Sequence, residues 1–264
     1  MITNTKVLFS AVLKSLKADC VCDIGSRDGD QALLFRHLCP EASVLAFEAN
    51  PINFAAMSRD VRLTNQRIEL FPFAISNARG MARFHITDVD YNDPDANKGT
   101  SSLLPSEKVK IKDAVEVETR RIDEVVPVQC PKAKAVALWI DVEGAEFGVL
   151  EGMAGIKDRV LAVHVETAKV KLREGQRTLA ELVSLMQSYG FVLCGSNIRS
   201  ASDWGDAVFV SERTIRTLGP RFGLCKLKGY LGFWVPVDHA AVFLKARFPA
   251  AYRLLRKAYL KVGT

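Results

Sequence analysis

The sequence of 264 residues has few of the features that mark special classes of protein. It has no internal repeat and no low-complexity segment, and hydrophobic residues make up 48% of it against 25% charged residues. This balance excludes an intrinsically disordered chain and a bundle of membrane spans. We therefore expect a globular protein with one large domain, or one domain with an appendage.

Cysteine pairs of the CxxC type are also absent, although the chain has six cysteines. Most of these cysteines lie inside apolar stretches typical of strands, which favours small core residues in a reducing compartment over a metal cluster. The N-terminal apolar run, residues 7–13, is ended by Lys14 and Lys17, and no A-x-A cleavage site precedes the first predicted strand. The run is short for a secretion signal, so we expect a cytoplasmic protein.

The net charge of +6 is concentrated at the C-terminal end of the chain. Eleven of the 36 Lys and Arg residues follow residue 211, where Glu212 and Asp238 are the acids, and the part before it has a slight excess of acidic groups. We expect a folded domain over residues 1–211 and a basic C-terminal extension over residues 212–264.

The spacing of residues 249–262 predicts an amphipathic helix in that extension, with basic side chains on one side and Leu254 and Leu255 on the other. Such a helix can dock on its own domain, attach peripherally to an anionic membrane surface, or contact a partner or a second copy. Peripheral attachment would place the protein at the inner membrane face. Nucleic acid is not an expected partner, because the basic residues are not interleaved with an exposed aromatic platform.

Apolar runs of strand length alternate with segments of helical spacing, a pattern typical of βαβ units and a parallel sheet. Strands are predicted at residues 20–24, 43–48, 68–75, 115–121, 135–141, 160–166, 191–194 and 207–210, with a hairpin arm at 80–86. Helices are predicted at residues 31–38, 53–63, 145–153 and 178–189. We therefore expect an α/β domain with a doubly wound, Rossmann-like sheet.

The longest polar stretch of the chain is residues 87–107. A loop of that length inside a compact domain is typically either a functional lid or a disordered segment. We expect it to be the most mobile element and to flank the ligand.

Ligands of an open parallel sheet bind beyond the carboxyl ends of its strands. The first predicted strand ends at Asp23 and Ile24 and continues through Gly25 and Gly29 into a helix. Glycines let the backbone approach a ligand closely, and the helix N-terminus offers unpaired N–H groups. Glu48 ends the second strand, at a spacing typical of an acid that accepts hydrogen bonds from ribose hydroxyls.

Carboxylates gather after the strand at 135–141, where Asp141, Glu143 and Glu146 follow one another closely. Acids at the mouth of a buried strand are expensive to desolvate and are therefore more often functional. Glu146 falls in the next helix and can equally be a cap that interacts with the helix dipole. On the neighbouring strand, alternation sends His164 and Glu166 to the same face, and one of them can be a satisfied core group.

At this point the sequence resembles the FkbM-type S-adenosylmethionine-dependent methyltransferases. The matching pieces occur in the family's order and spacing across about residues 20–170, and they read CDIGSRDGD, FEANP, AISNARGMARF, GTSSL, TRRIDEVV, LWIDVEGAEFGVLEGM and VHVE. The first piece departs from the family pattern, which has Ala-Asn after the glycine where this chain has Ser26-Arg27.

The resemblance implies a seven-stranded class I methyltransferase sheet with strand order 3-2-1-4-5-7-6, strand 7 antiparallel and helices on both faces. It also implies S-adenosylmethionine as cofactor and a hydroxyl of a sugar, glycan or natural product as the methyl acceptor. The cofactor contacts implied are the first glycine turn, the acid after strand 2 and its neighbours, the end of strand 3, and the acid after strand 4: Asp23, Gly25, Ser26, Arg27, Gly29, Glu48, Ala49, Asn50, Ile75, Ser76 and Asp141.

Methyl transfer to a hydroxyl requires the enzyme to position the acceptor oxygen and to remove its proton. The available side chains are Asp141, Glu143, His164 and Glu166. In one hypothesis His164 or Glu166 accepts the proton while Asp141 orients the substrate or the cofactor amine. In the other, Asp141 and Glu166 hold a divalent cation that lowers the pKa of the acceptor hydroxyl.

Three other functions are weighed against this one. A short-chain dehydrogenase needs a Tyr-x-x-x-Lys pair, and none of the five tyrosines has Lys four residues on. A nucleic-acid amino-methyltransferase would have Asn/Asp-Pro-Pro-aromatic where this chain has Asp141-Val142-Glu143-Gly144. A non-catalytic cofactor- or partner-binding protein on the same fold is the remaining alternative, against which the acids at 48 and 141 argue.

Overall fold

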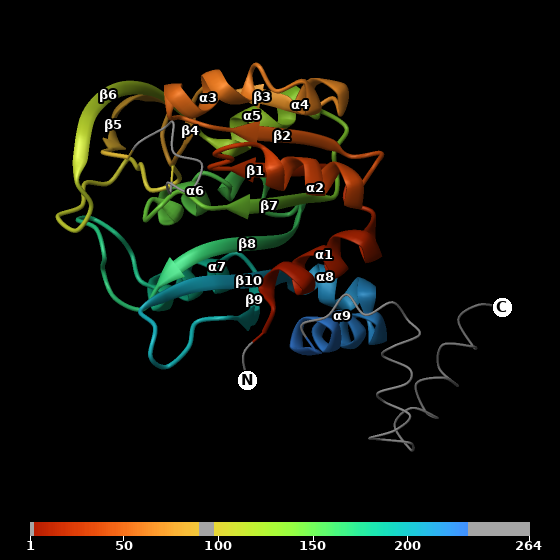
Figure 1. Ribbon diagram of the computed structural model, residues 1–264. Helices are drawn as coiled ribbons and strands as arrows, with labels where there is room; N and C mark the ends of the chain where they lie inside the picture. The colour runs from red at the N-terminus through yellow and green to blue at the C-terminus, as the bar shows by residue number, and fades with distance from the viewer. Residues whose placement is uncertain (1–2, 90–97, 232–264) are drawn as a thin grey trace. The chain divides into compact units, whose positions relative to one another are not determined.

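The computed structural model describes residues 3–89 and 98–231. Its centre is a seven-stranded sheet with the order β3-β2-β1-β7-β8-β10-β9 (Figure 1). All neighbours pair in parallel except β10, which runs antiparallel to both β8 and β9. The strands of this sheet are β1 (Cys20–Ile24), β2 (Ser43–Phe47), β3 (Glu69–Phe71), β7 (Val136–Ile140), β8 (Val160–Ala168), β9 (Phe191–Ser196) and β10 (Trp204–Ser211). Counted within this sheet alone, this is the predicted class I methyltransferase order, so the fold prediction is confirmed.

The prediction of a single third strand over residues 68–75 is wrong. The segment consists of β3, which ends at Phe71, and β4 (Ala74–Ile75), which joins a separate three-stranded sheet with the order β4-β6-β5. Pro72 stands at the break, and because it has no N–H it cannot donate a hydrogen bond that would extend the pairing of β3 with β2. The other two strands are the predicted hairpin arm, β5 (Gly80–Thr87), and β6 (Ile111–Arg120). This small sheet lies beside the carboxyl ends of the main strands (Figure 1).

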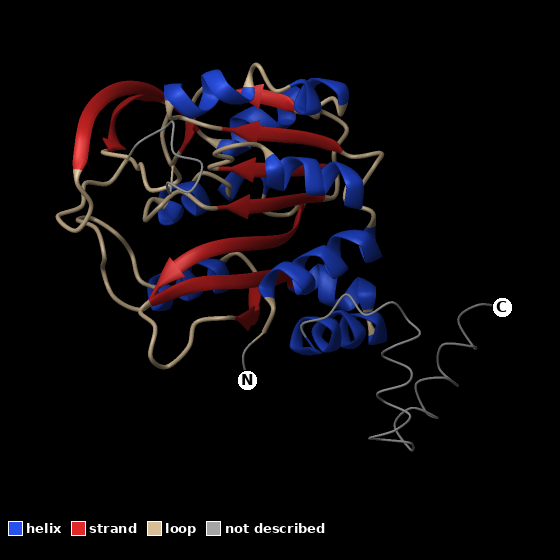
Figure 2. Cartoon of the chain, in the orientation of Figure 1, coloured by secondary structure: helices blue, strands red, loops and turns tan. Residues whose placement is uncertain are grey.

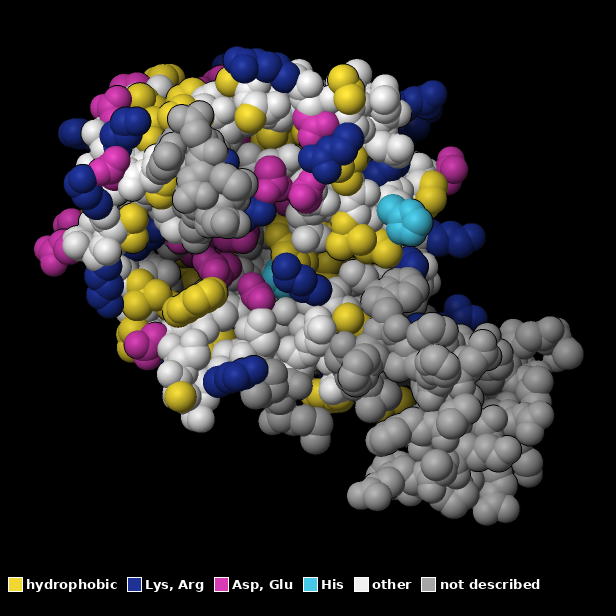
Figure 3. All heavy atoms as spheres, viewed as in Figure 1, with side chains coloured by type: hydrophobic (Ala, Val, Ile, Leu, Met, Phe, Trp, Pro, Cys, Tyr) yellow, Lys and Arg dark blue, Asp and Glu magenta, His cyan; other side chains and the backbone are white. Residues whose placement is uncertain are grey.

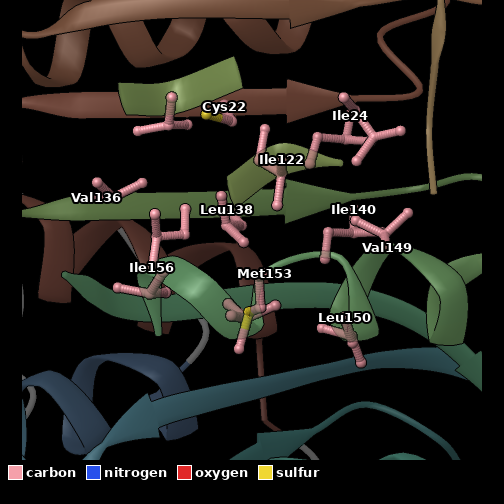
Figure 4. Close-up of a cluster of buried hydrophobic side chains, with 14 of the residues drawn as sticks. Cys22, Ile24, Ile122, Val136, Leu138, Ile140, Val149, Leu150, Met153 and Ile156 are labelled. Carbon is pink, nitrogen blue, oxygen red and sulfur yellow. The ribbon is translucent and has the colours of Figure 1, made fainter. Parts of the chain in front are cut away.

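Helices cover both faces of the main sheet (Figure 2). One face packs against α5 (Ile122–Gln129), α6 (Glu146–Glu151), the 3-10 turn η1 (Ala154–Ile156) and α7 (Leu179–Ser188). Their apolar side chains meet Cys22, Ile24 and Leu138 of the sheet in the cluster of Figure 4. The opposite face packs against α1 (Thr5–Leu16), α2 (Asp30–Leu38), α3 (Pro51–Met57) and α4 (Val61–Asn65). Burial on both faces explains why the central strands are continuous apolar runs.

The predicted helix at 53–63 is two helices in the structure. Asp60 begins α4 by accepting a hydrogen bond from the backbone N–H of Arg62 at 2.8 Å, and this cap separates α4 from α3. In the described residues before Glu212, the helices α1 and α5 were not predicted. The run considered as a secretion signal is part of α1, whose Leu8, Phe9 and Leu13 are fully buried. The other, α5, contains Pro127.

The first part of the predicted extension folds as two helices, α8 (Glu212–Leu218) and α9 (Pro220–Leu231), and α9 packs against α1. The compact unit therefore continues to Leu231, beyond the predicted boundary at residue 211. The predicted amphipathic helix at 249–262 lies outside the described residues. In the ranges 3–89 and 98–231, no helix is both long enough and apolar enough to cross a membrane. All six cysteines are buried and none forms a disulfide, in agreement with their prediction as core residues.

Candidate functional site

The turn between β1 and α2 is shaped by Gly25, which has a φ of 85°. A Cβ at this position would lie 1.8 Å from the carbonyl oxygen of Asp141, because the turn packs directly on the chain that leaves β7. The Gly25 N–H also donates to the carbonyl of Phe47 at 3.0 Å. Only glycine combines this φ with this close approach, so the turn joins the ends of β1, β2 and β7 at one place.

Asp23 and Ser26 stabilise this turn from its buried side. The Asp23 carboxylate is 1% exposed and accepts a hydrogen bond from the Ser26 hydroxyl at 2.5 Å. Burial raises the pKa of Asp23 to about 7, although the Ser26 hydroxyl opposes the shift. Both side chains therefore act on the shape of the turn rather than as part of a cavity wall.

Glu48, at the end of β2, is buried and held by two backbone N–H groups. Its Oε2 accepts from the N–H of Arg27 and its Oε1 from the N–H of Asn50, both at 2.7 Å. Burial raises the pKa of Glu48 to about 7, and the two hydrogen bonds oppose that rise. The carboxyl group thus has a fixed orientation at the strand end, which is where an acid that binds ribose hydroxyls is expected.

A first cavity opens beside these groups, with about 520 Å³ of free space that includes open solvent. Six of the predicted cofactor-binding residues line it: Gly25, Arg27, Glu48, Ala49, Ile75 and Asp141. Of the others, Asp23, Ser26 and Gly29 lie in or under the turn, and Asn50 caps α3 by accepting from the N–H of Ile52 at 3.0 Å. Ser76 is not brought to the cavity, because its backbone packs against Gly152 at the end of α6.

Further residues complete the wall of the first cavity; two phenylalanines among them were not predicted, whereas others belong to the predicted lid at 87–107. Phe73 and Phe84 contribute an apolar side from the chain around the second sheet, and Lys98, Ser101 and Leu103 contribute a side from the loop that follows residue 97. Ser102 in this loop pairs with His85 of β5 through two backbone hydrogen bonds of 2.8 and 3.1 Å. The described end of the predicted lid, residues 98–107, is thus fixed to the small sheet, while residues 90–97 lie outside the described residues.

Three carboxylates of the predicted catalytic set come together at the carboxyl ends of β7 and β8. One oxygen from each of Asp141, Glu143 and Glu166 lies within 4.8 Å of the others. Acidic side chains gather in the same part of the molecule in the space-filling view (Figure 3). Burial is the main cause that raises the pKa of Glu166, and the negative charges of Asp141 and Glu143 raise it further. The Asp141 side chain reaches solvent, but its pKa is raised as well. The main cause is desolvation by the surrounding protein, and the charge of Glu143 is the next largest cause.

Glu143 is held in place by Arg173, which was not predicted. Glu143 has a φ of 56°, and its Oε2 accepts a hydrogen bond from the Arg173 guanidinium at 3.1 Å. The same guanidinium, which is almost completely buried, donates to the carbonyls of Thr100 at 2.8 Å and Leu104 at 3.3 Å. Arg173 therefore connects the acid cluster to the loop that forms one wall of the first cavity.

Glu146 is the first residue of α6 and is 2% exposed. Its Oε1 accepts from the N–H of Gly144 at 2.7 Å, so it satisfies a backbone donor in front of the helix, as a capping side chain does. Burial raises the pKa of Glu146 to about 7.

His164 does not join the acid cluster. Its ring is 1% exposed, stacks on Trp139 at 3.5 Å between centroids and meets the edge of Phe9 at 5.8 Å. Burial holds its pKa well below the usual value, and neither ring nitrogen has a hydrogen-bond partner among the described residues. Alternation does send His164 to the face of Glu166, but it lies two residues deeper, under α1, and lines neither cavity.

A second cavity lies on the other side of the acid cluster, with about 940 Å³ of free space that includes open solvent. Glu143, Glu146 and Glu166 line it, and so do residues without a predicted role, among them Thr100, Ser106, Lys108, Thr167, Arg173, Gln176 and Trp204. The signal for this second cavity in the sequence was a large aromatic residue, Trp204, in the polar segment before the last predicted strand. The acid cluster therefore stands between two cavities, with Asp141 lining the first and the glutamates lining the second.

Comparisons with known proteins show what the chain as a whole is similar to. Residues 23–193 match the family model described as the Methyltransferase FkbM domain. The chain is 30% identical over 181 residues to 2-O-methyltransferase NoeI of Sinorhizobium fredii, covering 65% of this chain and 72% of that protein. It is 24% identical to Methyltransferase sdnD of Sordaria araneosa, over 72% and 78% of the two chains. A crystal structure of Methyltransferase FkbM from Methylobacillus flagellatus KT matches with a TM-score of 0.45 and 13% identity, over 74% of this chain and 44% of that one.

Proposed function

Because the chain belongs to the FkbM family of S-adenosylmethionine-dependent methyltransferases, we propose that it methylates a hydroxyl group of a sugar or natural-product acceptor. One observation carries the proposal: three carboxylates stand between two cavities, where a donor and an acceptor can meet. The 2-O-methyltransferase among the relatives supports oxygen as the atom that is methylated.

The residues of the first cavity fit the cofactor. Gly25 lines the cavity and lets its turn pack on the chain after β7, Glu48 presents a carboxyl group fixed by two N–H donors, and Phe73 and Phe84 form an apolar side. We assign these residues, with Ala49 and Ile75, to cofactor binding. When bound, S-adenosylmethionine supplies a methyl group activated by a positively charged sulfonium.

The residue that we assign to proton removal is Glu166. It lines the second cavity, and burial raises its pKa to about 9, so its carboxylate is a stronger base than an ordinary glutamate but is mostly protonated at neutral pH. His164 is less suitable because Trp139 and Phe9 cover its ring. Asp141 lines the first cavity and orients the groups that react, while Glu143, fixed by Arg173, shapes the wall between donor and acceptor.

A second candidate role for the same carboxylates is to hold a divalent cation. Asp141, Glu143 and Glu166 offer three oxygens within 4.8 Å of one another, and carboxylate oxygens are preferred ligands of Mg²⁺ and Ca²⁺. A cation held there would lower the pKa of the acceptor hydroxyl, so that a weaker base could remove the proton.

Methyl transfer from labelled S-adenosylmethionine to a panel of hydroxylated acceptors tests both roles. Glu166→Gln is expected to lower turnover by about 10² to 10⁴-fold, the usual contribution of a general base, with cofactor affinity close to wild type. His164→Gln should retain turnover, and Glu174→Gln, which alters an exposed acid outside both cavities, is the matched control.

The same assay with EDTA separates the base from the cation. Full activity in EDTA together with a loss in Glu166→Gln supports the base, whereas loss in EDTA that Mg²⁺ or Mn²⁺ restores supports the cation. Methylation of an amine or a carboxyl acceptor in preference to every hydroxyl would contradict the proposed reaction.

A further inference from the structure

We propose that the exposed side of α9 is a docking surface for a negatively charged lipid bilayer, and that it holds the protein on the membrane surface without crossing the membrane. The inference goes beyond the methyl transfer reaction and does not depend on the identity of the acceptor. It is carried by two features of α8 and α9: an apolar strip that points outward and an excess of positive charge around it.

The inner side of α9 determines which residues point outward. Cys225 and Gly229 are buried against α1, where a Cβ on Gly229 would lie 2.9 Å from the Cβ of Leu8. The Gly229 carbonyl accepts from the N–H of Asn4 at 2.7 Å, and the Cys225 sulfur lies 3.5 Å from the hydroxyl of Ser15. Because these contacts hold α9 along its length, the opposite side of the helix stays at the surface.

The outward side of α9 presents an apolar strip. Leu224 is 47% exposed and Tyr230 is 39% exposed. Leu227, which is half-buried, lies between them, since residues three apart are neighbours on a helix. Single exposed apolar side chains are common on protein surfaces, but adjacent ones rimmed by charged groups mark an interaction site.

Basic side chains border this strip on both edges. Arg221 and Lys228 lie about one turn before and one turn after Leu224 along one edge, and both are exposed. Lys226 lies on the other edge, with its Nζ 5.9 Å from the centre of the Tyr230 ring. Leucine and tyrosine side chains between flanking Lys and Arg residues are typical of helices that lie in the plane of a membrane interface.

The charge of the α8–α9 segment favours a negatively charged partner. Residues 212–231 have five basic side chains and one acid, Glu212, which pairs with Arg216 at 3.2 Å. The other four basic side chains form no ion pair within the described part of the chain. A second copy of this surface would bring the same charge, and so would residues 232–264, which have six basic side chains against Asp238. Like charges therefore disfavour both as the molecule that covers α9.

Among negatively charged partners, a bilayer matches both features of the surface. Its head groups attract the basic residues, and the boundary with the acyl chains takes up leucine and tyrosine side chains. The phosphates of a nucleic acid would attract the basic residues but would leave the leucines in water. The 12 residues of α9 are fewer than the roughly 20 that a membrane span needs, so α9 lies on the membrane.

Membrane contact at α9 leaves both cavities open. The residues that line the two cavities come from neither α8 nor α9. Since β10 runs antiparallel to β8, Val210 near the end of β10 pairs with Ala162 near the start of β8. The helix α8 therefore begins at the amino ends of the parallel strands, whereas the cavities lie at their carboxyl ends (Figure 1).

Sedimentation of the full chain with vesicles tests the docking. The vesicles are phosphatidylcholine alone and an equimolar mixture of phosphatidylcholine and phosphatidylglycerol. We expect binding to the mixed vesicles, binding at least about tenfold weaker to phosphatidylcholine alone, and weaker binding at high salt, because salt screens exposed charges. Leu224→Ser should weaken binding to the mixed vesicles about fivefold or more. The double variant Arg221→Gln, Lys228→Gln should weaken it about tenfold or more, since each basic residue near an anionic surface contributes about fivefold in affinity.

Matched controls alter the same kinds of residue elsewhere. Val128→Ser changes an exposed apolar residue of α5, and the double variant Arg79→Gln, Arg83→Gln removes two exposed charges at the hairpin arm. Both controls should bind the mixed vesicles as wild type does. All of these variants change exposed residues, so their Tm should equal that of wild type.

A label distinguishes α9 from the segment that follows it. Because all six cysteines are buried, Leu224→Cys supplies a single exposed thiol for an environment-sensitive dye. On mixed vesicles the emission of this dye should shift to shorter wavelength and be quenched by nitroxide-labelled lipid. The same dye on Val128→Cys should show neither change.

Four results would each overturn the proposal: no binding to the mixed vesicles, equal binding to phosphatidylcholine alone, unchanged binding of the Leu224 and Arg221, Lys228 variants, or a dye at residue 224 that stays in water. A shift of the dye without lipid as the protein concentration rises would overturn it in favour of a second copy. Release from the vesicles by duplex DNA would overturn it in favour of a nucleic acid.

Discussion

Arg173→Ala should be among the most damaging substitutions outside the core. The side chain is 6% exposed and forms a salt bridge of 3.1 Å with Glu143, which is 25% exposed, together with hydrogen bonds to two carbonyls. Removing one partner of a fully buried ion pair costs about 3 to 5 kcal/mol. Because Glu143 keeps contact with water, we expect a smaller loss in the free energy of unfolding, about 2 to 4 kcal/mol, and a fall in Tm on the order of 10 °C.

The assay is urea unfolding followed by circular dichroism, with Arg173→Lys and Glu143→Gln measured alongside. Lysine retains the charge, but its single ammonium nitrogen cannot occupy the positions of both guanidinium nitrogens that donate here, so Arg173→Lys should recover less than half of the loss. The double variant Arg173→Ala, Glu143→Gln should lose less than the sum of the two single variants, because the two side chains interact directly. Losses below about 0.5 kcal/mol in both Arg173 variants would refute this account, since exposed positions give changes of that size.

Three other predictions concern residues in and near the walls of the two cavities. Glu48→Ala should weaken S-adenosylmethionine binding by about 1.5 to 3 kcal/mol in calorimetry, the range for a charged hydrogen-bond partner, and unchanged affinity in a folded variant would contradict its role. Gly25→Ala places a Cβ 1.8 Å from the Asp141 carbonyl oxygen, so thermal unfolding and calorimetry should show loss of stability and of cofactor binding together. Asp23, Glu48 and Glu146 have pKa values raised by burial to about 7, so between about pH 5 and 7 the folded state binds more protons than the unfolded state. The free energy of unfolding should therefore fall as pH rises through that window, and Glu146→Gln should make the fall shallower; a rise would contradict the sign.

Much of the main sheet could be predicted because its strands are buried on both faces and are uniformly apolar. The predicted strand at 20–24 has the bounds of β1, and the acids after β2 and β7 lie at the strand ends, as the pattern indicated. The break at Pro72 was missed because the residues on both sides of it are strand-like, and only the departure of β4 to another sheet reveals it. The helix α1 was missed because its apolar residues 7–13 were considered only as a secretion signal, although the segment has one apolar and one polar side.

The residues of the site could be predicted only where they lie at or near the carboxyl ends of predicted strands. The positions of Glu48, Asp141 and Glu166 follow from the rule that ligands bind at the carboxyl ends of parallel strands. Arg173 and Trp204 could not be predicted in the same way, because each lies in a polar segment whose place depends on tertiary contacts. Trp204 reaches the cavity through the antiparallel pairing of β10 with β8, and Arg173 through carbonyls far away in the chain.

The two tryptophans of the described residues make this protein its own spectroscopic reporter. Trp139 is 6% exposed and stacked on His164, so its emission should lie at short wavelength and be shielded from acrylamide. Trp204 is 57% exposed, so its emission should lie at long wavelength and be quenched readily. In a Trp234→Phe background, the long-wavelength edge of the emission spectrum would therefore record the entry of a molecule into the second cavity. The short-wavelength edge of the same unlabelled sample would record whether the core under α1 is intact.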